Sequence, residues 1–592
     1  MLDLLHNLVQ KPVAYLGRTL SPRQFLIVSS ILVGLTSGLA GVAVKYVVHS
    51  IGQLVAFYSG NYEQFFLFAL FPTIGILLTV FFIRYFLNGK LPRGSADIVY
   101  SIAKKSSKIP VEQTYAHMIT SALTVGFGGS MGLESPMVST GSAIGSNYGT
   151  TYKLGYRERT ILLACGASAG IAAAFNSPIA GVLFAVEVLL ADVSSAAFIP
   201  LIISAASGAL LSKIILGDSI ILSFSLAQPF DYRNVPFYVL LGLVAGFISL
   251  YYARVYTWAE KRMHQIGNTW SRALAGGLFL FVLILLFPPL FGEGYYTIKQ
   301  LADLQSKALF ENSILFSFID TQIFLVILLA LLIFIKPIAA AITIGSGGNG
   351  GNFAPSLFVG AYVGFVFATI VNMTGLTYIP ESNFTLVAMA GILSGIFYAP
   401  LTAIFLIAEI TGGYELMIPL MIVSALSLSV AHLFEPMSMD ARILSARLRG
   451  SIETRDKFLL SKLDVSELIE TNFLAVRPEH TLEELIRVIA QSNRNIFPVT
   501  DESEKLLGVV HLDKIRAVIF GAGDRKATTV RDLMTPAAAI IGEHENLHQV
   551  LTKFEDTKSW NLPVVNDEGC YVGFLSKSSI LARYRNELME SM

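Results

Sequence analysis

Charged residues are scarce in this sequence. Asp, Glu, Lys and Arg make up 14% of its 592 residues, and their formal charges sum to zero, whereas a soluble domain usually carries about 25% of such residues. A chain without net charge has no overall field that would attract nucleic acid or an acidic surface, so no nucleic-acid partner is predicted. Hydrophobic residues account for 54% of the chain. This composition predicts a protein that lies in a lipid bilayer.

Cysteine is rarer still. Cys165 and Cys570 fall in different predicted domains, without the spacing of a metal or redox pair, which fits a reducing cytoplasm. The nine histidines are scattered, and the sequence contains neither a nucleophile with its base nor a phosphate loop of the usual type. An enzyme is therefore the least favoured class, and no catalytic residue or metal ligand is assigned.

Long apolar runs are what the chain has instead. Several approach the roughly 20 residues that a bilayer core requires, among them Phe25 to Val44, Phe65 to Ile83, Pro236 to Ala253 and Leu274 to Phe291. These runs predict transmembrane helices. The first run lacks the small-residue cleavage site of a signal peptide, so it is interpreted as a retained span.

The composition changes near Ala441, where apolar runs give way to charged sequence. We predict a membrane domain at residues 1–445, a linker at 446–463 and a soluble domain at 464–592. Basic residues flank the membrane domain on both sides and, by the positive-inside tendency, place both ends in the cytoplasm: Lys11, Arg18 and Arg23 before it, and Arg442, Arg447 and Arg449 after it. The prediction is a multi-pass protein of the plasma (inner) membrane.

An internal repeat runs through the membrane part. Gly132-Leu133-Glu134-Ser135-Pro136 aligns without gaps with Gly351-Asn352-Phe353-Ala354-Pro355, 219 residues later, and Pro178 to Glu187 matches Pro400 to Glu409, 222 residues later. Transporters are often built from such halves in opposite orientations, with discontinuous helices whose N-termini point at an anion. In each half a Gly-rich stretch precedes the start of a helix, where free N–H groups attract negative charge. The alternative is that these glycines only let helices pack closely.

Ionisable residues inside apolar segments are hypotheses for functional sites. Glu134 lies where the backbone N–H groups are expected to converge, so its carboxylate can occupy the anion position, leave when protonated and act as gate and proton acceptor. The alternative is a glutamate that only complements its own helix dipole. Glu187 and Glu409 occupy equivalent places and are predicted to hold helix ends. Lys336 is equally well explained as an anchor at the membrane interface.

These motifs resemble those of the CLC chloride channel and transporter family over roughly Pro22 to Leu444. The resemblance implies an all-α membrane domain with inverted repeats, a homodimer with a separate anion pathway in each subunit, and Glu134 as the gating glutamate. It assigns the binding of chloride or a similar small anion to Arg93, Gly94, Asn352 and Phe353.

The sequence also departs from the family pattern. Arg93 stands where the family usually has a serine; its guanidinium either binds the anion or turns to the cytoplasmic mouth. Asp440 stands near an expected tyrosine and is hypothesised to pair with Arg93 as an inner gate. Val188 replaces the inner glutamate of proton-coupled members, which slightly favours a passive channel. Proton-coupled exchange remains the alternative.

The soluble part contains a second repeat. Asn495-Ile496-Phe497-Pro498-Val499 recurs 65 residues later as Asn561-Leu562-Pro563-Val564, each with an amphipathic stretch before it and strand-like runs after it. This α/β unit resembles a pair of CBS domains, which implies an adenine nucleotide as a ligand. Lys514 and Ser579 occupy the places of the usual ribose-binding acid, so no cofactor is assigned and the pair is alternatively a dimer-stabilising unit.

Two other classes compete with anion transport. A divalent-cation transporter with CBS domains requires clustered carboxylates, and the three membrane glutamates are too dispersed for that. A membrane sensor, in which the CBS pair reads a ligand and the helices only anchor it, predicts no flux.

Overall fold

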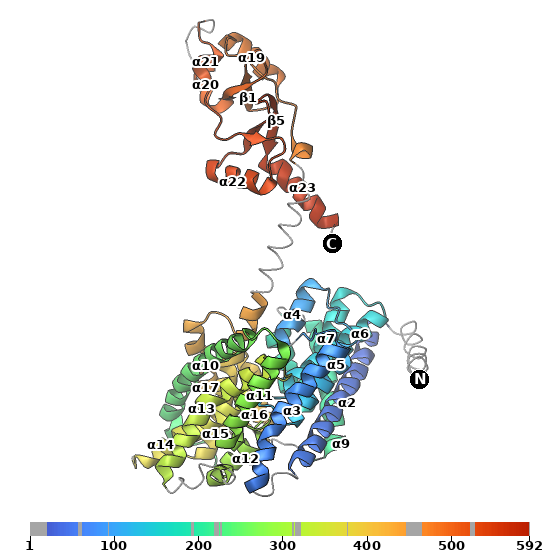
Figure 1. The fold of residues 1–592 in the computed structure, drawn as a ribbon, viewed down its shortest axis with the longest axis vertical. Coiled ribbons are helices and arrows are strands. Elements are labelled where there is room, and N and C mark those ends of the chain that lie inside the picture. Colours follow the sequence, from blue (N-terminus) through green and yellow to red (C-terminus); the bar gives the residue numbers. More distant parts are fainter. Residues whose placement is uncertain are drawn as a thin grey trace. The chain divides into compact units, whose positions relative to one another are not determined.

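The computed structural model describes residues 21–56, 62–92, 94–190, 195–217, 224, 228–310, 313, 321–375, 377–445, 465–520 and 527–590. The chain divides into two compact units, Met1–Ser445 and Ala446–Met592. Within the described residues the first unit is helical, and the second combines short helices with strands (Figure 1).

The first unit is a bundle of two structurally related halves. The first half contains α2 (Pro22–Ala56), α3 (Tyr62–Phe86), α4 (Gly94–Lys104), α5 (Gln113–Gly126), α6 (Glu134–Thr151), α7 (Tyr156–Phe175), α8 (Pro178–Phe184), the π-helix η2 (Ala185–Leu189) and α9 (Ser195–Leu216). The second half contains α10 (Val235–His264), α11 (Thr269–Leu286), α12 (Tyr295–Ala302), α13 (Gln322–Gly345), α14 (Phe353–Met373), α15 (Glu381–Phe397), α16 (Pro400–Ile410) and α17 (Met417–Phe434). Short 3₁₀ turns lie at η3 (Tyr232–Asn234), η4 (Pro288–Leu290) and η5 (Ser306–Phe310).

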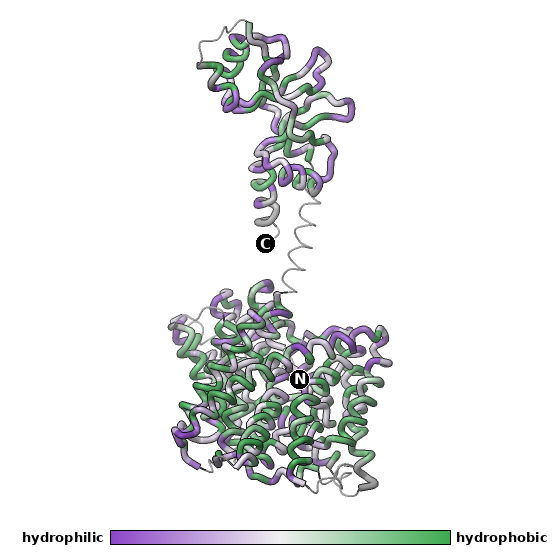
Figure 2. The backbone as a smooth tube through the Cα atoms, turned by 90° about the vertical axis from the view of Figure 1, so that its left-hand side faces the viewer, coloured by the Kyte–Doolittle hydropathy of each residue, from purple (hydrophilic) through white to green (hydrophobic). Residues whose placement is uncertain are grey.

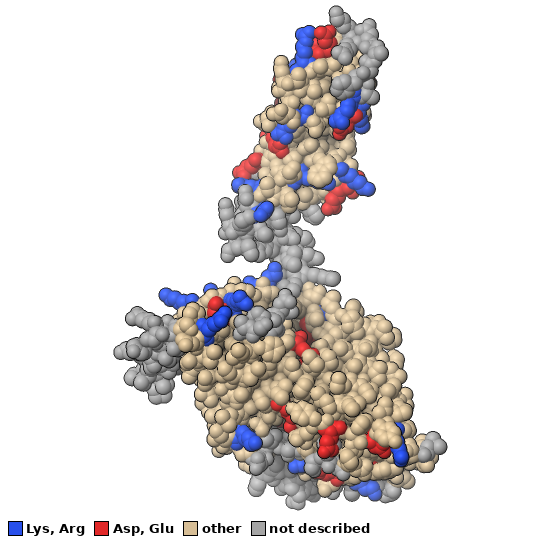
Figure 3. All heavy atoms as spheres, turned by 180° about the vertical axis from the view of Figure 1, so that it is seen from behind, with Lys and Arg blue, Asp and Glu red and all other residues tan. Residues whose placement is uncertain are grey.

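The helices of this unit suit a bilayer. Among the described residues, nine helical segments are long and apolar enough to cross a membrane. Three of the four apolar runs predicted from sequence lie within α2, α3 and α10, and the fourth, Leu274 to Phe291, covers most of α11 and extends past its end through η4. Hydrophobic residues dominate the helices in Figure 2. On the face shown in Figure 3, Lys and Arg gather toward the two ends of the unit and leave a broad band between them free of positive charge.

Corresponding backbone conformations mark the repeat. Gly128 and Gly347, which are equivalent in the alignment, both have positive φ, at 93° and 110°. Asn176 and Tyr398 end α7 and α15 in the left-handed conformation, with φ of 55° and 59°. Left-handed backbone is uncommon for residues other than glycine, so its recurrence at matching positions shows that the two halves follow the same path.

The glycines downstream of each motif serve helix packing. A Cβ at Gly141 would overlap the backbone of Gly166 where α6 crosses α7, and a Cβ at Gly360 would overlap Met389 where α14 crosses α15. The packing alternative therefore holds for these glycines, which lie inside helices. The glycines of the loops before α6 and α14 have a different role, described below.

The second unit is built from two copies of one α/β motif. The first copy comprises η7 (Ser466–Leu468), α19 (Leu482–Gln491), β1 (Ile496–Thr500), β2 (Leu506–His511) and α20 (Leu512–Phe520). The second comprises α21 (Val530–Leu533), β3 (Ile541–Gly542), α22 (Leu547–Thr557), β4 (Asn561–Val565), β5 (Tyr571–Ser576) and α23 (Lys577–Glu590).

The two copies are joined through their strands. In each copy an antiparallel hairpin, β1–β2 or β4–β5, receives a parallel partner, through the Val476–Val499 bridge in the first and through β3 in the second. A residue near the start of each copy pairs with the hairpin of the other copy, at Glu470–Phe574 and Thr535–Val509. This exchange makes the two copies a single folded unit.

Candidate functional site

Two loops of the membrane unit meet directly in front of α6 and α14. The Gly132 N–H donates to the Gly351 carbonyl at 3.0 Å, and the Gly351 N–H donates to the Gly132 carbonyl at 2.8 Å. These glycines are equivalent in the repeat, and their antiparallel pairing is what a local two-fold axis between the halves produces. The pairing brings together the starts of α6, at Glu134, and α14, at Phe353.

The Glu134 carboxylate lies at this junction. The side chain is almost completely buried, with 2% of its surface exposed. The Tyr295 hydroxyl donates a hydrogen bond to Oε1, and the carboxylate lies against the backbone N–H groups of Ala354 and of Glu134 itself. Among the described residues, Oε2 has no hydrogen bond of regular geometry. The carboxylate therefore faces the N-termini of both helices, where negative charge is favoured.

Gly132 leaves just enough room for this arrangement. A Cβ at this position would overlap both Glu134 Oε2 and the Ala354 side chain. Glycine is thus required by the close approach of the backbone to the carboxylate, rather than by helix packing alone.

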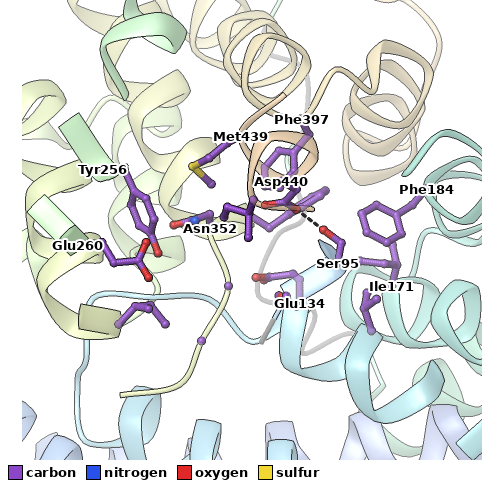
Figure 4. A pocket seen from close by; sticks show the side chains of 18 residues that line it. Ser95, Glu134, Ile171, Phe184, Tyr256, Glu260, Asn352, Phe397, Met439 and Asp440 are labelled. Atoms are coloured by element: carbon purple, nitrogen blue, oxygen red, sulfur yellow. Dashed lines mark hydrogen bonds between the residues drawn. The ribbon is translucent and has the colours of Figure 1, made fainter. Parts of the chain in front are cut away.

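A pocket of about 110 Å³ opens beside Glu134, whereas one water needs only about 10 to 15 Å³. Its polar lining includes residues from five parts of the chain: Ser95 of α4, Glu134 of α6, Glu260 of α10, Asn352 before α14 and Asp440 after α17. Figure 4 shows the Glu134, Glu260 and Asp440 side chains reaching the pocket from different elements. The site has room for a small anion with several waters.

The structure brings most of the predicted anion-site residues together. Gly94, Asn352, Phe353 and Asp440 line the same pocket as Glu134. Asn352 is the N-cap residue of α14, and its Oδ1 accepts a hydrogen bond from the Tyr252 hydroxyl at 3.3 Å. Arg93 lies outside the described residues, and with it the hypothesised Arg93–Asp440 pair. The Asp440 carboxylate accepts a hydrogen bond from the Ser95 hydroxyl (dashed line in Figure 4).

Glu187 and Glu409 hold helix ends, as predicted, and each holds a helix of the other half. Glu187 accepts from the Leu401 and Thr402 N–H groups of α16, at 3.0 and 2.7 Å, and from the Thr402 hydroxyl. Glu409 accepts from the Ile179 and Ala180 N–H groups of α8, at 3.0 and 2.9 Å. The two contacts satisfy the free N–H groups of both helix starts.

Lys336 is not an interfacial anchor, and that interpretation is wrong. Its side chain has no exposed surface, and its ammonium donates to the Ser130 hydroxyl at 2.8 Å and to the Gly292 carbonyl at 3.2 Å. The apolar run before Lys336, Ile323 to Ile335, is shorter than the roughly 20 residues of a complete span, and α13 continues beyond it to Gly345. Lys336 therefore lies inside the helix bundle.

Sequence reasoning missed three residues around Glu134: Lys45, Glu293 and Tyr295. Lys45 follows directly after the first apolar run, which was taken to end at Val44, although α2 extends to Ala56. Glu293 and Tyr295 belong to a short connection and have no repeat partner that marks them. Within the described chain, no group of three or more His, Cys, Asp or Glu side chains is arranged to hold a metal ion.

Lys514 and Ser579 occupy the positions where CBS domains usually carry a ribose-binding acid, and the two side chains differ in their environment. Lys514 is exposed. The Ser579 hydroxyl donates to the Ser576 carbonyl at 2.9 Å, so it is engaged within its own helix turn.

Paired helix N-termini, a buried carboxylate between them and a bundle of apolar helices define a membrane protein of the anion channel and transporter class. The family model described as "Voltage gated chloride channel" matches residues 75–432, and the CBS domain model matches residues 465–521 and 530–586. The chain belongs to the voltage-gated chloride channel (CLC) family and carries two CBS domains.

Relatives and solved structures agree with this assignment. A ClcB-like chloride channel protein of Ralstonia nicotianae is 29% identical over 391 residues, covering 64% of this chain and 85% of that protein. Chloride channel protein CLC-f of Arabidopsis thaliana is 26% identical over 469 residues, covering 70% of this chain and 58% of that protein.

The fold also matches solved structures. A slow cyanobacterial Cl−/H+ antiporter superposes with a TM-score of 0.63 at 22% identity, covering 73% of this chain and 99% of that chain. A eukaryotic CLC transporter superposes with a TM-score of 0.57 at 19% identity, covering 94% of this chain and 97% of that chain. The predicted fold class, an all-α membrane unit followed by an α/β CBS pair, is confirmed.

Proposed function

We propose that this chain moves chloride or a similar inorganic anion through a pathway that Glu134 gates. The observation that carries the proposal is the place of the Glu134 carboxylate, against N–H groups at the starts of α6 and α14. Helix N-termini attract anions. A carboxylate held there is a tethered substitute for a free anion, so an anion enters only when the carboxylate leaves.

Protonation is the event that releases the carboxylate. A neutral carboxyl group is a weaker competitor for the N–H groups of α6 and α14 than an anion is. The Tyr295 hydroxyl, which donates to Glu134, holds the charged form in the closed position. Glu134 is therefore gate and proton acceptor at once.

The pocket beside Glu134 forms the inner part of the proposed pathway. The N–H groups in the first turn of α14, from Phe353 onward, have no partners within the helix and face the anion together with Asn352 and Gly94. Asp440 is the proposed inner gate, because its negative charge opposes anion entry while Ser95 holds it beside the pocket. Arg93 remains a prediction as an anion ligand.

Passive conduction and proton-coupled exchange both follow from such a gate. Val188, in the place of an inner glutamate, favours passive conduction, as the sequence predicted. Proton-coupled exchange is a second candidate because Glu134, Glu260 and Asp440 line one pocket, and intramembrane carboxylates are the usual carriers of protons.

We further propose a homodimer with one pathway in each subunit, in a plasma (inner) membrane, with the CBS pair in the cytoplasm. The basic residues that follow the last membrane helix support this orientation. Lys514 and Ser579, in the places of a ribose-binding acid, leave the nucleotide ligand unassigned. A membrane sensor without transport activity is the competing hypothesis.

Reconstitution separates these alternatives. Purified protein in liposomes with a chloride gradient is followed by chloride efflux and internal pH together. Passive conduction predicts chloride efflux without proton movement, and coupled exchange predicts that a chloride gradient drives protons uphill. A sensor predicts no flux of either ion, which would contradict the proposed function.

The matched control tests the helix-dipole alternative. Glu134→Gln removes the charge from the first turn of α6, and Glu158→Gln does the same in the first turn of α7, away from the pocket. A gating role predicts that only Glu134→Gln makes chloride flux independent of pH. If both substitutions affect flux equally, the carboxylate only complements its helix.

A further inference from the structure

Four ionisable side chains gather on the side of the gate away from the pocket. They are Glu134, Lys45 of α2, Glu293 before α12 and Lys336 of α13. Electrostatic interactions connect Glu293 with Glu134, Lys45 and Lys336, and connect Lys45 with Glu134. Of these four, only Glu134 takes part in the proposed gating, and the sequence pattern assigned no function to the other three.

Backbone and side-chain contacts fix the positions of these charges. Glu293 Oε1 accepts from the Leu133 N–H at 3.2 Å, which places the carboxylate next to the gate's own backbone. Lys45 donates to the Ala173 carbonyl at 3.0 Å and to the Ala174 carbonyl at the end of α7. Glu293 is thus held at the residue that precedes Glu134, and Lys45 is held at the end of α7, within electrostatic reach of Glu134.

Lys336 is the most enclosed of the group. Its ammonium is completely buried and lies 4.7 Å from the centre of the Phe358 ring. The other contacts are the Ser130 hydroxyl and the Gly292 carbonyl, both neutral. A buried ammonium that meets only neutral partners is costly unless opposite charge lies nearby, and Glu293 supplies it.

The formal charges of the four groups balance only while Glu134 is ionised. With all four groups in their charged forms, two ammonium groups face two carboxylates, so the group as a whole carries no net charge. Protonation of Glu134 leaves one buried positive charge without compensation. In a low-dielectric interior that charge attracts an anion strongly, and the vacated position at the helix N-termini is where an anion finds it.

We propose that Lys45, Lys336 and Glu293 form a fixed charge cluster that sets the pH at which Glu134 opens and draws one anion into its place. The inference deepens the proposed function, because it assigns the regulation of the same gate to residues that do not line the pocket. The three are positioning residues that act through charge.

Other groups also face Glu134. Tyr295 donates to it, and the pocket side presents Tyr256, Glu260 and Asp440. The carboxylates on the pocket side make Glu134 easier to protonate, and the ammonium groups of the fixed charge cluster act against them. Because the two sets of charges act in opposite directions, each substitution in the fixed charge cluster should shift the pH midpoint of Glu134 in a defined direction.

The test is the pH of half-maximal chloride efflux from liposomes. Glu293→Gln removes a negative neighbour, so Glu134 stays ionised to lower pH and the midpoint falls, by about one pH unit. Lys45→Gln and Lys336→Met remove a positive neighbour, so the midpoint rises by about one unit. Opposite shifts are the expected result; shifts of the same sign, or none, would overturn the proposal.

A purely structural role for these residues gives a different pattern. It predicts loss of folded protein, measured by thermal unfolding in detergent, without opposite midpoint shifts. Because Lys336→Met removes a buried contact, Lys45→Gln and Glu293→Gln keep the test available if that variant does not fold. Lys45→Arg preserves the charge and is expected to keep the wild-type midpoint.

A second background shows whether the cluster acts through Glu134. In Glu134→Gln protein, flux has no Glu134-dependent midpoint, so the pH shifts should vanish. The half-saturating chloride concentration should fall on the order of tenfold with Glu293→Gln and rise on the order of tenfold with Lys45→Gln, because the net charge beside the anion changes by one. If the wild-type protein transports chloride but the cluster substitutions leave half-saturating chloride unchanged in Glu134→Gln protein, the fixed charge cluster is contradicted and the proposed function is not. If the wild-type protein transports no chloride, the proposed function itself is contradicted.

Discussion

The two halves of the membrane unit share a scaffold but differ in chemistry. Lys336 of α13 contacts Ser130 in the loop of the first half, at 2.8 Å. At the equivalent positions, His117 of α5 contacts Asn349 in the loop of the second half, at 3.4 Å between ring and amide nitrogens. Each half thus braces the other's loop with a buried polar side chain, but only the second half uses a lysine.

The same contrast appears where the two helices start. Glu134 begins α6 and Phe353, its equivalent, begins α14. The repeat builds two matching helix N-termini, whereas the ionisable groups occur at one of them. In the proposed function, symmetry between the halves provides the anion site, and departures from symmetry provide the gate.

The largest expected effect concerns the contacts that both halves share. Glu187→Ala removes three hydrogen bonds from the start of α16, and Glu409→Ala removes two from the start of α8. Each change leaves helix N–H groups without a partner, so we expect a loss of about 2 to 4 kcal/mol, larger for Glu187. Thermal or denaturant unfolding in detergent measures it. Glu158→Ala, in the first turn of α7, is the control with little effect.

A smaller loss of stability is expected at Gly132, which lies beside the Glu134 carboxylate; the second half has no carboxylate at the equivalent position. A methyl group at Gly132 overlaps Glu134 Oε2 and Ala354, so Gly132→Ala should lower stability by about 1 to 3 kcal/mol and displace the gate. Gly413, with no heavy atom near its added Cβ, provides the control. If Gly132→Ala protein releases chloride at neutral pH as slowly as the wild type, the Glu134 carboxylate does not need this space.

Substitution of Asp440 tests its proposed role as the inner gate. Asp440→Asn keeps the shape and the contact to Ser95 but removes the negative charge from the pocket. We expect chloride efflux to rise several-fold and half-saturating chloride to fall, because an anion no longer meets a like charge. Ser95→Ala is the partner variant, which frees Asp440 without neutralising it. Unchanged efflux in Asp440→Asn would remove Asp440 from the inner gate.

The smallest expected effect is on the pH dependence of stability in the CBS pair, where the two copies carry different residues at one equivalent position. His511 ends β2, and Ser576 ends β5 at the equivalent place. Burial lowers the pKa of His511 below its ordinary value, and the positive charge of Lys514 adds to this. Since the unfolded chain binds the proton more readily, stability is lost as pH falls through the ordinary histidine range.

Replacing His511 by the residue of the other copy isolates that contribution. In His511→Ser protein, the pH-dependent part of CBS stability should shrink between pH 7.5 and 5.5. Limited proteolysis of the full chain at the two pH values measures it, with His480→Ser as the control. A wild-type CBS unit that becomes more resistant as pH falls would contradict a lowered pKa of His511 in the folded state.

The repeats made much of this architecture predictable. Gly, Pro and Glu at fixed offsets predicted that Gly132 and Gly351 belong to equivalent loops, and the loops prove to pair with each other. The same offsets predicted equal roles for Glu187 and Glu409. A repeat constrains three-dimensional structure because equivalent sequences adopt equivalent backbones, even when the halves are far apart along the chain.

Residues outside the repeat could not be placed in this way. Tyr295 contacts Glu134, and Glu293 contacts the Leu133 N–H from 160 residues further along the chain; both contacts depend on how α12 packs. The burial of Lys336 depends on how far α13 extends beyond its apolar run. Hydropathy gives the length of such a run, whereas the depth of a side chain in the bundle is set by its neighbours.

The central claim is that Glu134 occupies an anion position between the starts of α6 and α14. Crystals of Glu134→Gln and of wild-type protein soaked in bromide at neutral pH test it directly by anomalous scattering. We predict a bromide peak near the Ala354 N–H in Glu134→Gln and none at that position in wild type. A peak there in both proteins, or in neither, would contradict the tethered-anion gate.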